Sequence, residues 1–255
     1  EIGVDRGVLY RLNEEEEYTD GVPWNGLIGV TDNNSGNERT PLYTNGYITD
    51  SVYTSEEYGG TIDCYTYPSE LEKMLGEVEV SRGIYVRQQK RPFFGLCYRT
   101  LVGNDVSGTD YGYKLHLVYN ARVTEYSRSY SSLNDSFSPG EISIPFEAIP
   151  LNVENASPVS EIVVDSTAFG KDRMSWLENI LYGSDENNNI PRLPYPDELM
   201  ELFSNEDLTE ADWYGYPHDD INPDDYLYPG NAEAVIGETG IITRTGSVTV
   251  TMQGN

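Results

Sequence analysis

Alternating apolar and polar positions dominate the chain and predict a mainly β protein. The clearest run is Tyr113–Thr124, where Tyr113, Leu115, Leu117, Tyr119, Ala121 and Val123 share one face. Successive side chains of a strand point to opposite faces, so this run predicts a long strand with one buried face. Further strands are expected at Gly7–Leu12, Trp24–Val30, Thr61–Tyr67, Phe93–Leu101, Glu141–Ile149, Ser160–Asp165 and Ile241–Met252. Pro145 favours a sheet edge or a bulge, because proline has no N–H to donate.

Helical periodicity is confined to three short segments. Ser69 and Glu72 have the spacing of a capping box, and Gly76 is placed to close that helix. A second helix is expected over Lys171–Tyr182, and a third after Pro196. Together these elements predict a mostly antiparallel β-sandwich or barrel with one to three short peripheral helices.

Long polar loops separate the predicted elements. The loop Val102–Gly112 contains Gly, Asn and Asp residues and is expected to be a hairpin or loop connection. The loop Leu208–Ala234 is rich in Pro, Asp and Tyr. A polar loop of that length in a compact domain is usually disordered or a binding arm.

Charge is strongly negative and unevenly placed. The chain has 16 Lys and Arg against 43 Asp and Glu, a net charge of −27. Asp185–Glu238 holds 15 acids and one base, whereas Ser81–Tyr130 holds eight bases and three acids. Solubility or a high-salt host is the simpler explanation of the total. The uneven distribution also allows copies of the chain to bind one another by charge complementarity. The 21 Tyr, against 6 Phe, suit interfaces and half-exposed strands.

The two cysteines, Cys64 and Cys97, lie in strand-like segments, and we expect them to be unbridged and buried as small core residues. No apolar run approaches the length of a membrane span, and no signal peptide is expected.

Catalytic motifs are missing from the sequence, so we expect a protein that is not an enzyme and has no cofactor. His116 and His218 are the only histidines. His116 lies within a predicted strand, where a solvated or hydrogen-bonded histidine is the expected state. The acids of Asp219–Asp225 could gather oxygens around Ca²⁺, although their spacing does not match a helical calcium loop.

Several segments, in order along residues 1–204, resemble the major tail tube proteins of long-tailed, siphovirus-type bacteriophages. The segment Phe93–Thr100, followed by Asp110–Ala121, carries most of the resemblance. The others are Glu1–Tyr10, Trp24–Leu27, Pro41–Tyr43, Ser55–Pro68, Gly103–Asp105, Ser131–Ser136, Leu181–Gly183 and Pro191–Pro194. The resemblance implies a tail tube β-sandwich domain over residues 1–204. We expect residues 205–255 to be an acidic loop and C-terminal strand extension of the same domain.

The resemblance also implies a role and partners. It implies a structural virion protein that forms stacked rings of about six copies, with part of each sheet closing a shared barrel. DNA would pass through an acidic channel as non-specific cargo, because a wall that repels phosphate lets it slide. Other partners would be tape measure, tail terminator and distal tail proteins. The location would be the tail of the virion, after assembly in the bacterial cytoplasm.

Two sets of residues are candidates for these roles. Asp63, Glu77 and Glu79 alternate with apolar neighbours and are candidates for the lumen wall, with Glu141 and Glu147 as weaker ones. Inter-subunit contacts are expected from the basic residues Arg82, Arg87, Lys90, Arg91 and Arg99.

Two other functions compete with this interpretation. Abundant Tyr and Trp and the possible Ca²⁺ site also suit an acidic, secreted carbohydrate-binding or adhesin module with a β-sandwich fold. Abundant carboxylates suit an acidic glycoside hydrolase, although no pair of acids is singled out.

Overall fold

The computed structural model describes residues 1–13, 17–36, 39–45, 47–53, 57–105, 108–126, 140–154, 156–184, 189–205, 209, 232–236 and 248–252. The main sheet is antiparallel throughout. Its order is β2 (Tyr18–Trp24), β1 (Ile2–Leu12), β9 (Phe94–Asn104), β10 (Gly108–Val123), β11 (Ile142–Ala148), β6 (Tyr58–Cys64) and β3 (Leu27–Asp32). A further strand, β12 (Glu161–Asp165), pairs with β10.

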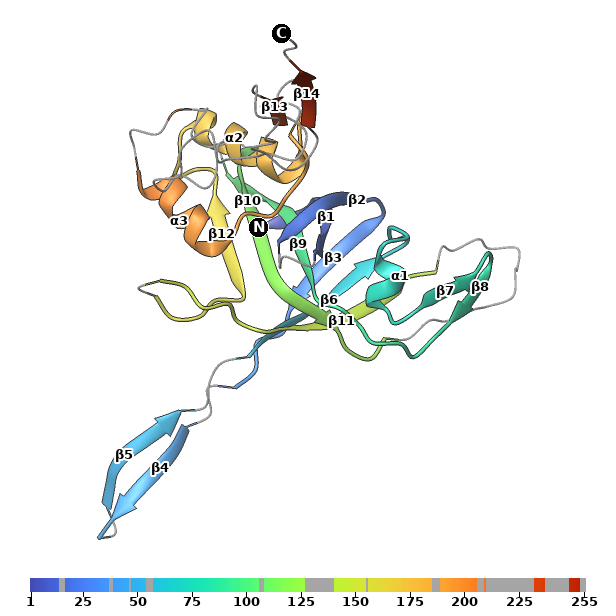
Figure 1. Ribbon diagram of the computed structural model, residues 1–255. Coiled ribbons are helices and arrows are strands. Elements are labelled where there is room, and N and C mark those ends of the chain that lie inside the picture. The colour runs from blue at the N-terminus through green and yellow to red at the C-terminus, as the bar shows by residue number, and fades with distance from the viewer. Residues whose placement is uncertain are drawn as a thin grey trace.

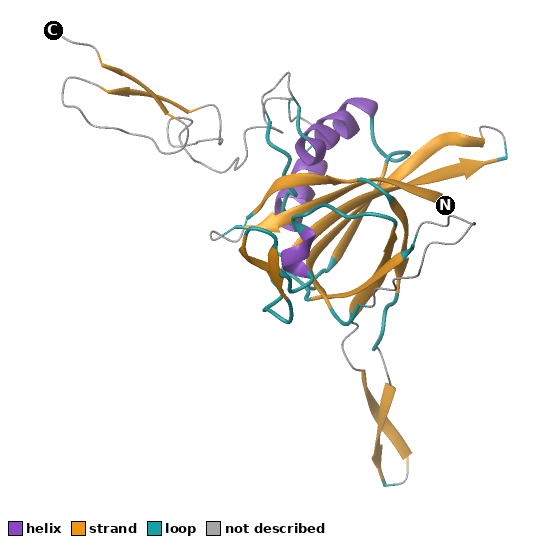
Figure 2. Ribbon diagram, turned by 90° about the vertical axis from the view of Figure 1, so that its right-hand side faces the viewer, coloured by secondary structure: helices purple, strands orange, loops and turns teal. Residues whose placement is uncertain are grey.

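The sheet curls on itself, and β1 also contacts β3. Figure 2 shows the resulting barrel from the side that best displays its curvature. Three helices accompany it: α1 (Leu71–Met74), α2 (Lys171–Tyr182) and α3 (Pro196–Ser204). The prediction of a mainly antiparallel β fold with one to three short helices is confirmed.

Two hydrophobic cores lie on the two faces of the sheet. The first fills the barrel interior and includes Leu9, Ile62, Phe94, Leu96 and Ile144, together with Leu71 and Met74 of α1. The second lies between the sheet and helices α2 and α3, and includes Tyr10, Leu115, Leu117, Tyr119, Leu177, Leu181 and Leu202. Burying this apolar surface is the main force that holds the helices on the barrel.

Strand β10 differs from the prediction of one buried face, because both of its faces are buried. Leu115, Leu117 and Tyr119 belong to the helix-side core, whereas Val118, Ala121 and Val123 belong to the barrel core. The pairing of β10 with β9 shifts register between Val118 and Ala121, and Asn120 there has φ of 46°. The bulge turns the strand, so that Ala121 and Val123 face the barrel although they continue the alternation of Tyr119.

The capping box predicted at Ser69 is wrong. Helix α1 starts after Glu70, which makes no side-chain cap, and the Ser69 hydroxyl donates to the Glu70 carboxylate (3.2 Å). The predicted end of this helix is confirmed. Gly76 follows the helix at φ of 80°, in the left-handed region that favours glycine.

The predicted strand Trp24–Val30 is two strands, β2 and β3, joined by a turn at Asn25 and Gly26. Gly26 has φ of 86°, and a Cβ there would lie 2.4 Å from Oγ1 of Thr66. Sterics therefore require glycine at this turn. The connection expected over Val102–Gly112 is a hairpin between β9 and β10, but most of the range expected as loop is strand, because β9 runs to Asn104 and β10 starts at Gly108.

Pro145 lies in β11, which is inside the strand order and not at the edge of the sheet. Its pairing with β10, however, covers only Phe146, Glu147 and Ala148. Pro145 directly precedes Phe146, the first residue of β11 that pairs with β10, and its carbonyl accepts from the Thr124 amide (2.9 Å). The proline therefore lies at a local end of pairing, where its missing N–H is tolerated.

Burial of both cysteines is confirmed, and the two lie in different cores. Cys64 is in the barrel interior and Cys97 is on the helix side. Burial raises the pKa of the Cys64 thiol to about 11 and that of Cys97 to about 12.

In the C-terminal region, β13 (Ala232–Ile236) pairs in parallel with β14 (Val248–Met252). Of the strand predicted at Ile241–Met252, residues 241–247 lie outside the described residues. The assignment of 205–255 to the same domain stays a prediction. Within the described part of the chain, no helix has the length and hydrophobicity to cross a membrane.

Candidate assembly surface

Two hairpins leave the barrel, and we name them the long arm and the basic arm. The long arm is residues 39–53, formed by β4 (Arg39–Thr44) and β5 (Tyr47–Tyr53). It projects far from the barrel in both overall views (Figures 1 and 2). The basic arm, named for Arg82 in its turn although it also carries Glu79, is residues 78–86, formed by β7 (Val78–Ser81) and β8 (Ile84–Val86) beside α1. Each arm is a separate two-stranded sheet.

The long arm exposes large apolar side chains at its far end. Leu42 and Tyr43 of β4, with Tyr47 and Ile48 of β5, are 46–79% exposed. An isolated two-stranded hairpin is marginally stable at best in water. Exposed apolar clusters of this kind mark interaction surfaces. The far end of the arm therefore presents apolar surface of the kind that is found at interaction sites.

The sequence contains a hairpin signal for the long arm. Asn45-Gly46 lies between two runs rich in Tyr, Leu and Ile, and Asn45 adopts φ of 53°. Asn-Gly flanked by such runs is the strongest short-range signal for a hairpin. The strands expected from the sequence include none in residues 39–53, so the arm was not predicted.

The basic arm is fixed at its root by polar contacts. The Gln89 amide donates to the Gly76 carbonyl (3.0 Å), where a Cβ on Gly76 would lie 2.8 Å from the Gln89 carbonyl oxygen. Glu77 is 7% exposed; it accepts from the Tyr126 hydroxyl (2.7 Å) and pairs with Arg87 (3.3 Å). These contacts fix the direction in which the arm leaves the barrel.

The outer part of the basic arm is exposed to water. A carboxylate oxygen of Glu79 accepts from the Gly83 amide (2.7 Å) and closes the turn. Val80, Ile84 and Tyr85 are 49–60% exposed, and Arg82 is exposed at the tip. The arm thus presents apolar side chains around one cation.

The five basic residues predicted for inter-subunit contact fall into two groups. Arg87 pairs with Glu77, and Arg91 donates to the carbonyls of Val123 (3.3 Å) and Thr124. Arg99 forms a bidentate pair with Asp5 (2.6 and 2.7 Å). Arg82 and Lys90 are exposed and form no ion pair within the described residues. The role of all five in subunit contacts stays a prediction, and the geometry favours Arg82 and Lys90.

The Asp5–Arg99 pair makes stability depend on pH. Hydrogen bonding to the Arg99 guanidinium lowers the pKa of Asp5 below its usual value. A carboxylate with a lowered folded-state pKa stabilises the fold above its unfolded pKa, and this contribution is lost as pH falls through the folded pKa. We expect Asp5→Asn to cost about 1 kcal/mol of unfolding free energy at pH 7. The difference from the parent should shrink below pH 4 in urea unfolding.

Asp20→Asn is the matched control for this prediction. Asp20 pairs with Arg11 (2.9 Å), but both side chains are about half exposed, at 59% and 47%. Water screens such a pair, so we expect a loss of only a few tenths of a kcal/mol at pH 7. A cost for Asp5→Asn that is the same at pH 7 and pH 3 would contradict the proposed linkage.

The lumen candidates occupy different surroundings. Asp63 is half-buried in β6 and accepts from the Ser143 hydroxyl (2.5 Å). Glu77 is the buried acid at the root of the basic arm, and Glu79 lies on that arm. Glu141 and Glu147 are exposed. Their position relative to a channel stays a prediction.

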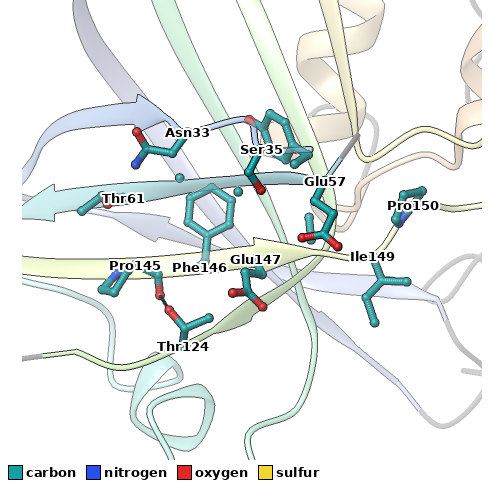
Figure 3. A pocket seen from close by; sticks show the side chains of 14 residues that line it. Asn33, Ser35, Glu57, Thr61, Thr124, Pro145, Phe146, Glu147, Ile149 and Pro150 are labelled. Atoms are coloured by element: carbon teal, nitrogen blue, oxygen red, sulfur yellow. Dashed lines mark hydrogen bonds between the residues drawn. The ribbon is translucent and has the colours of Figure 1, made fainter. Parts of the chain in front are cut away.

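A pocket of about 470 Å³ lies over β6 and β11. It borders the base of the long arm, where Ser35 and Glu57 lie. Figure 3 shows Glu57 and Glu147 directed into the same open space, with Phe146 and Ile149 among the apolar lining. Glu57 and Ser35 exchange two backbone hydrogen bonds (2.7 and 2.9 Å), which hold the two chain segments together at the base of the arm. Neither carboxylate forms an ion pair with another described residue. Thr124, Pro145 and Pro150 complete the rim.

His116 was expected to be either solvated or hydrogen-bonded, and it is hydrogen-bonded. The side chain is 8% exposed; its Nε2 lies 3.0 Å from Thr100 Oγ1, and its Nδ1 lies 3.0 Å from a Glu161 carboxylate oxygen. The imidazole also stacks on the Tyr98 ring, with 4.5 Å between centroids. These contacts give it a structural role between β9, β10 and β12.

Groups of acids, histidines and cysteines arranged for a metal ion do not occur among the described residues. The acids of Asp219–Asp225, proposed above for Ca²⁺, lie outside those residues.

No protein-family model and no curated protein matches the chain. Solved structures that are similar to this chain include components of injection systems. One is the extended sheath–tube complex of an extracellular contractile injection system, PVC: identity is 16%, coverage is 65% of this chain and 92% of the other, and the TM-score is 0.32. Another is the anti-feeding prophage cap: identity 14%, coverage 65% and 92%, TM-score 0.34. A third is the anti-feeding prophage baseplate: identity 7%, coverage 64% and 95%, TM-score 0.34.

Proposed function

We propose that this chain is the structural subunit of a tail tube, and that it assembles with copies of itself and has no catalytic role. The observation that carries the proposal is the long arm. It extends from the barrel and exposes Leu42, Tyr43, Tyr47 and Ile48 at its end. A hairpin without a core of its own is marginal in water, so its conformation is best explained by docking on a neighbouring subunit.

The ordered resemblance over residues 1–204 supports the finer form of the proposal. In that form about six copies close a ring, and rings stack into the tube of a long-tailed phage.

The net charge of −27 supports a channel wall that does not bind DNA. A wall that repels phosphate acts within about a Debye length, roughly 8 Å at physiological salt, and so keeps a duplex away from the wall without stopping it. DNA would be cargo and not a ligand. Tape measure, terminator and distal tail proteins would be the other partners, and the virion tail would be the location.

Electron microscopy and sedimentation of the purified chain test the proposal. We expect rings of about six copies that extend into tubes as concentration rises. Sedimentation should show association that follows mass action. A chain that stays monomeric across the whole concentration range, and forms no tubes when the other tail components are added, would overturn the proposal.

A further inference from the structure

We propose that the basic arm of one copy binds in the Glu57–Glu147 pocket of a second copy, with Arg82 placed between the two carboxylates. The inference rests on the proposed function, which it makes specific by naming one contact between neighbouring subunits. The contact is heterologous, because the arm and the pocket are different surfaces of the same chain.

The basic arm has the properties of a rigid, incomplete element. Its root is held by the Gly76–Gln89 hydrogen bond and by buried Glu77, and it points away from the barrel (Figure 1). Its outer part exposes Val80, Ile84 and Tyr85 to water. An arm that is already ordered loses little conformational entropy when it docks.

The pocket supplies what the arm lacks. Glu57 and Glu147 point into one concavity and form no ion pair inside the described chain. Ile149 on the rim is 55% exposed and provides apolar surface for the side chains next to Arg82. A guanidinium suits a site with two carboxylates, because its planar group can donate to both.

Charge explains why a second copy is the occupant. Two chains of −27 repel each other at long range, so a specific contact must bring opposite charges together. The segment Ser81–Tyr130, which includes Arg82, holds eight bases and three acids, whereas the described lining of the pocket has two carboxylates and no Lys or Arg. A head-to-tail contact of this kind generates a ring when the rotation closes.

Charge reversal and mixing test the inference. We expect Arg82→Glu, and separately Glu57→Lys with Glu147→Lys, to weaken self-association about tenfold or more in sedimentation velocity. Mixing the two variants should restore association to within about threefold of the parent, since each arm then meets a pocket of opposite charge. A mixture that associates no better than its components would overturn the inference.

Lys171→Glu is the control, because it makes the same change in net charge at an exposed residue of α2. We expect it to leave association within about twofold of the parent. Association of Arg82→Glu equal to that of Lys171→Glu would overturn the inference and leave the proposed function standing. A parent chain that never associates would overturn both. Circular dichroism should show all variants folded, since every changed side chain is exposed.

Cross-linking gives an independent readout. Ser81→Cys and Ile149→Cys chains keep Arg82 and both carboxylates, since Ser81 is the exposed neighbour of Arg82 on the arm. Mixed and treated with a short bismaleimide, they should give a linked dimer that either variant alone gives only weakly. The native thiols would react slowly, because burial raises the pKa of Cys64 to about 11 and of Cys97 to about 12. Equal yields from the mixture and from the single variants would overturn the inference.

Discussion

Arg192→Ala is expected to lower the unfolding free energy by about 3–5 kcal/mol, because it leaves a buried carboxylate without its partner. Arg192 forms a bidentate pair with Glu198 of α3 (2.8 and 2.5 Å). The Glu198 side chain is 1% exposed and that of Arg192 is 19% exposed. The Arg192 amide also donates to the Ile180 carbonyl, so the pair connects the ends of α2 and α3.

Two variants separate this effect from a general loss of charge. Arg11→Ala removes the cation of an exposed pair, and we expect it to cost less than about 1 kcal/mol in urea unfolding. Replacing both Arg192 and Glu198 with leucine should cost much less than Arg192→Ala, because no buried charge is left. Equal costs for Arg192→Ala and Arg11→Ala would contradict the buried-pair explanation.

Removal of the apolar end of the long arm is expected to abolish assembly without unfolding the subunit. Leu42, Tyr43, Tyr47 and Ile48 would be changed together to serine. Each such side chain contributes about 1.5–3 kcal/mol when fully buried. Losing four at an interface should weaken association by more than about 100-fold. Sedimentation velocity and electron microscopy provide the measurement.

The matched control replaces exposed apolar residues elsewhere. Ile190→Ser with Met200→Ser changes two side chains that are 41% exposed near the helices. We expect rings and tubes to form as in the parent. Thermal unfolding of the four-residue variant should match the parent, because the arm is a sheet of its own. Normal tubes from that variant would remove the observation on which the proposed function rests.

Helix α2 was predictable to the residue because its determinants are local. An apolar stripe occupies Met174, Leu177, Ile180 and Leu181, and Gly183 follows at φ of 78°. The double burial of β10 was not predictable from alternation. It depends on the bulge at Asn120 and on α2 and α3 covering the second face, both of which arise from residues distant in sequence.

The candidate site was predictable only in part. The excess of basic residues in Ser81–Tyr130 led to a prediction of subunit contacts there, which stays a prediction, and charge counting cannot tell which cations form ion pairs within the chain. Arg99 and Asp5 are 94 residues apart and meet only through the pairing of β1 with β9. The pocket likewise requires the register of β11 on β6, which places Phe146 opposite Gly60. Such pairings are set by tertiary contacts and not by local pattern.

Asn120 has a consequence for how the molecule comes apart. The bulge at this residue makes one continuous strand part of both hydrophobic cores. Helices α2 and α3 therefore cannot unfold while the barrel stays folded, because releasing Leu115 and Tyr119 disturbs the backbone that carries Val118 and Ala121. A subunit pulled or heated should lose both layers in one cooperative step. In the tail tube proposed above, such a subunit would have no half-open form with exposed core surface.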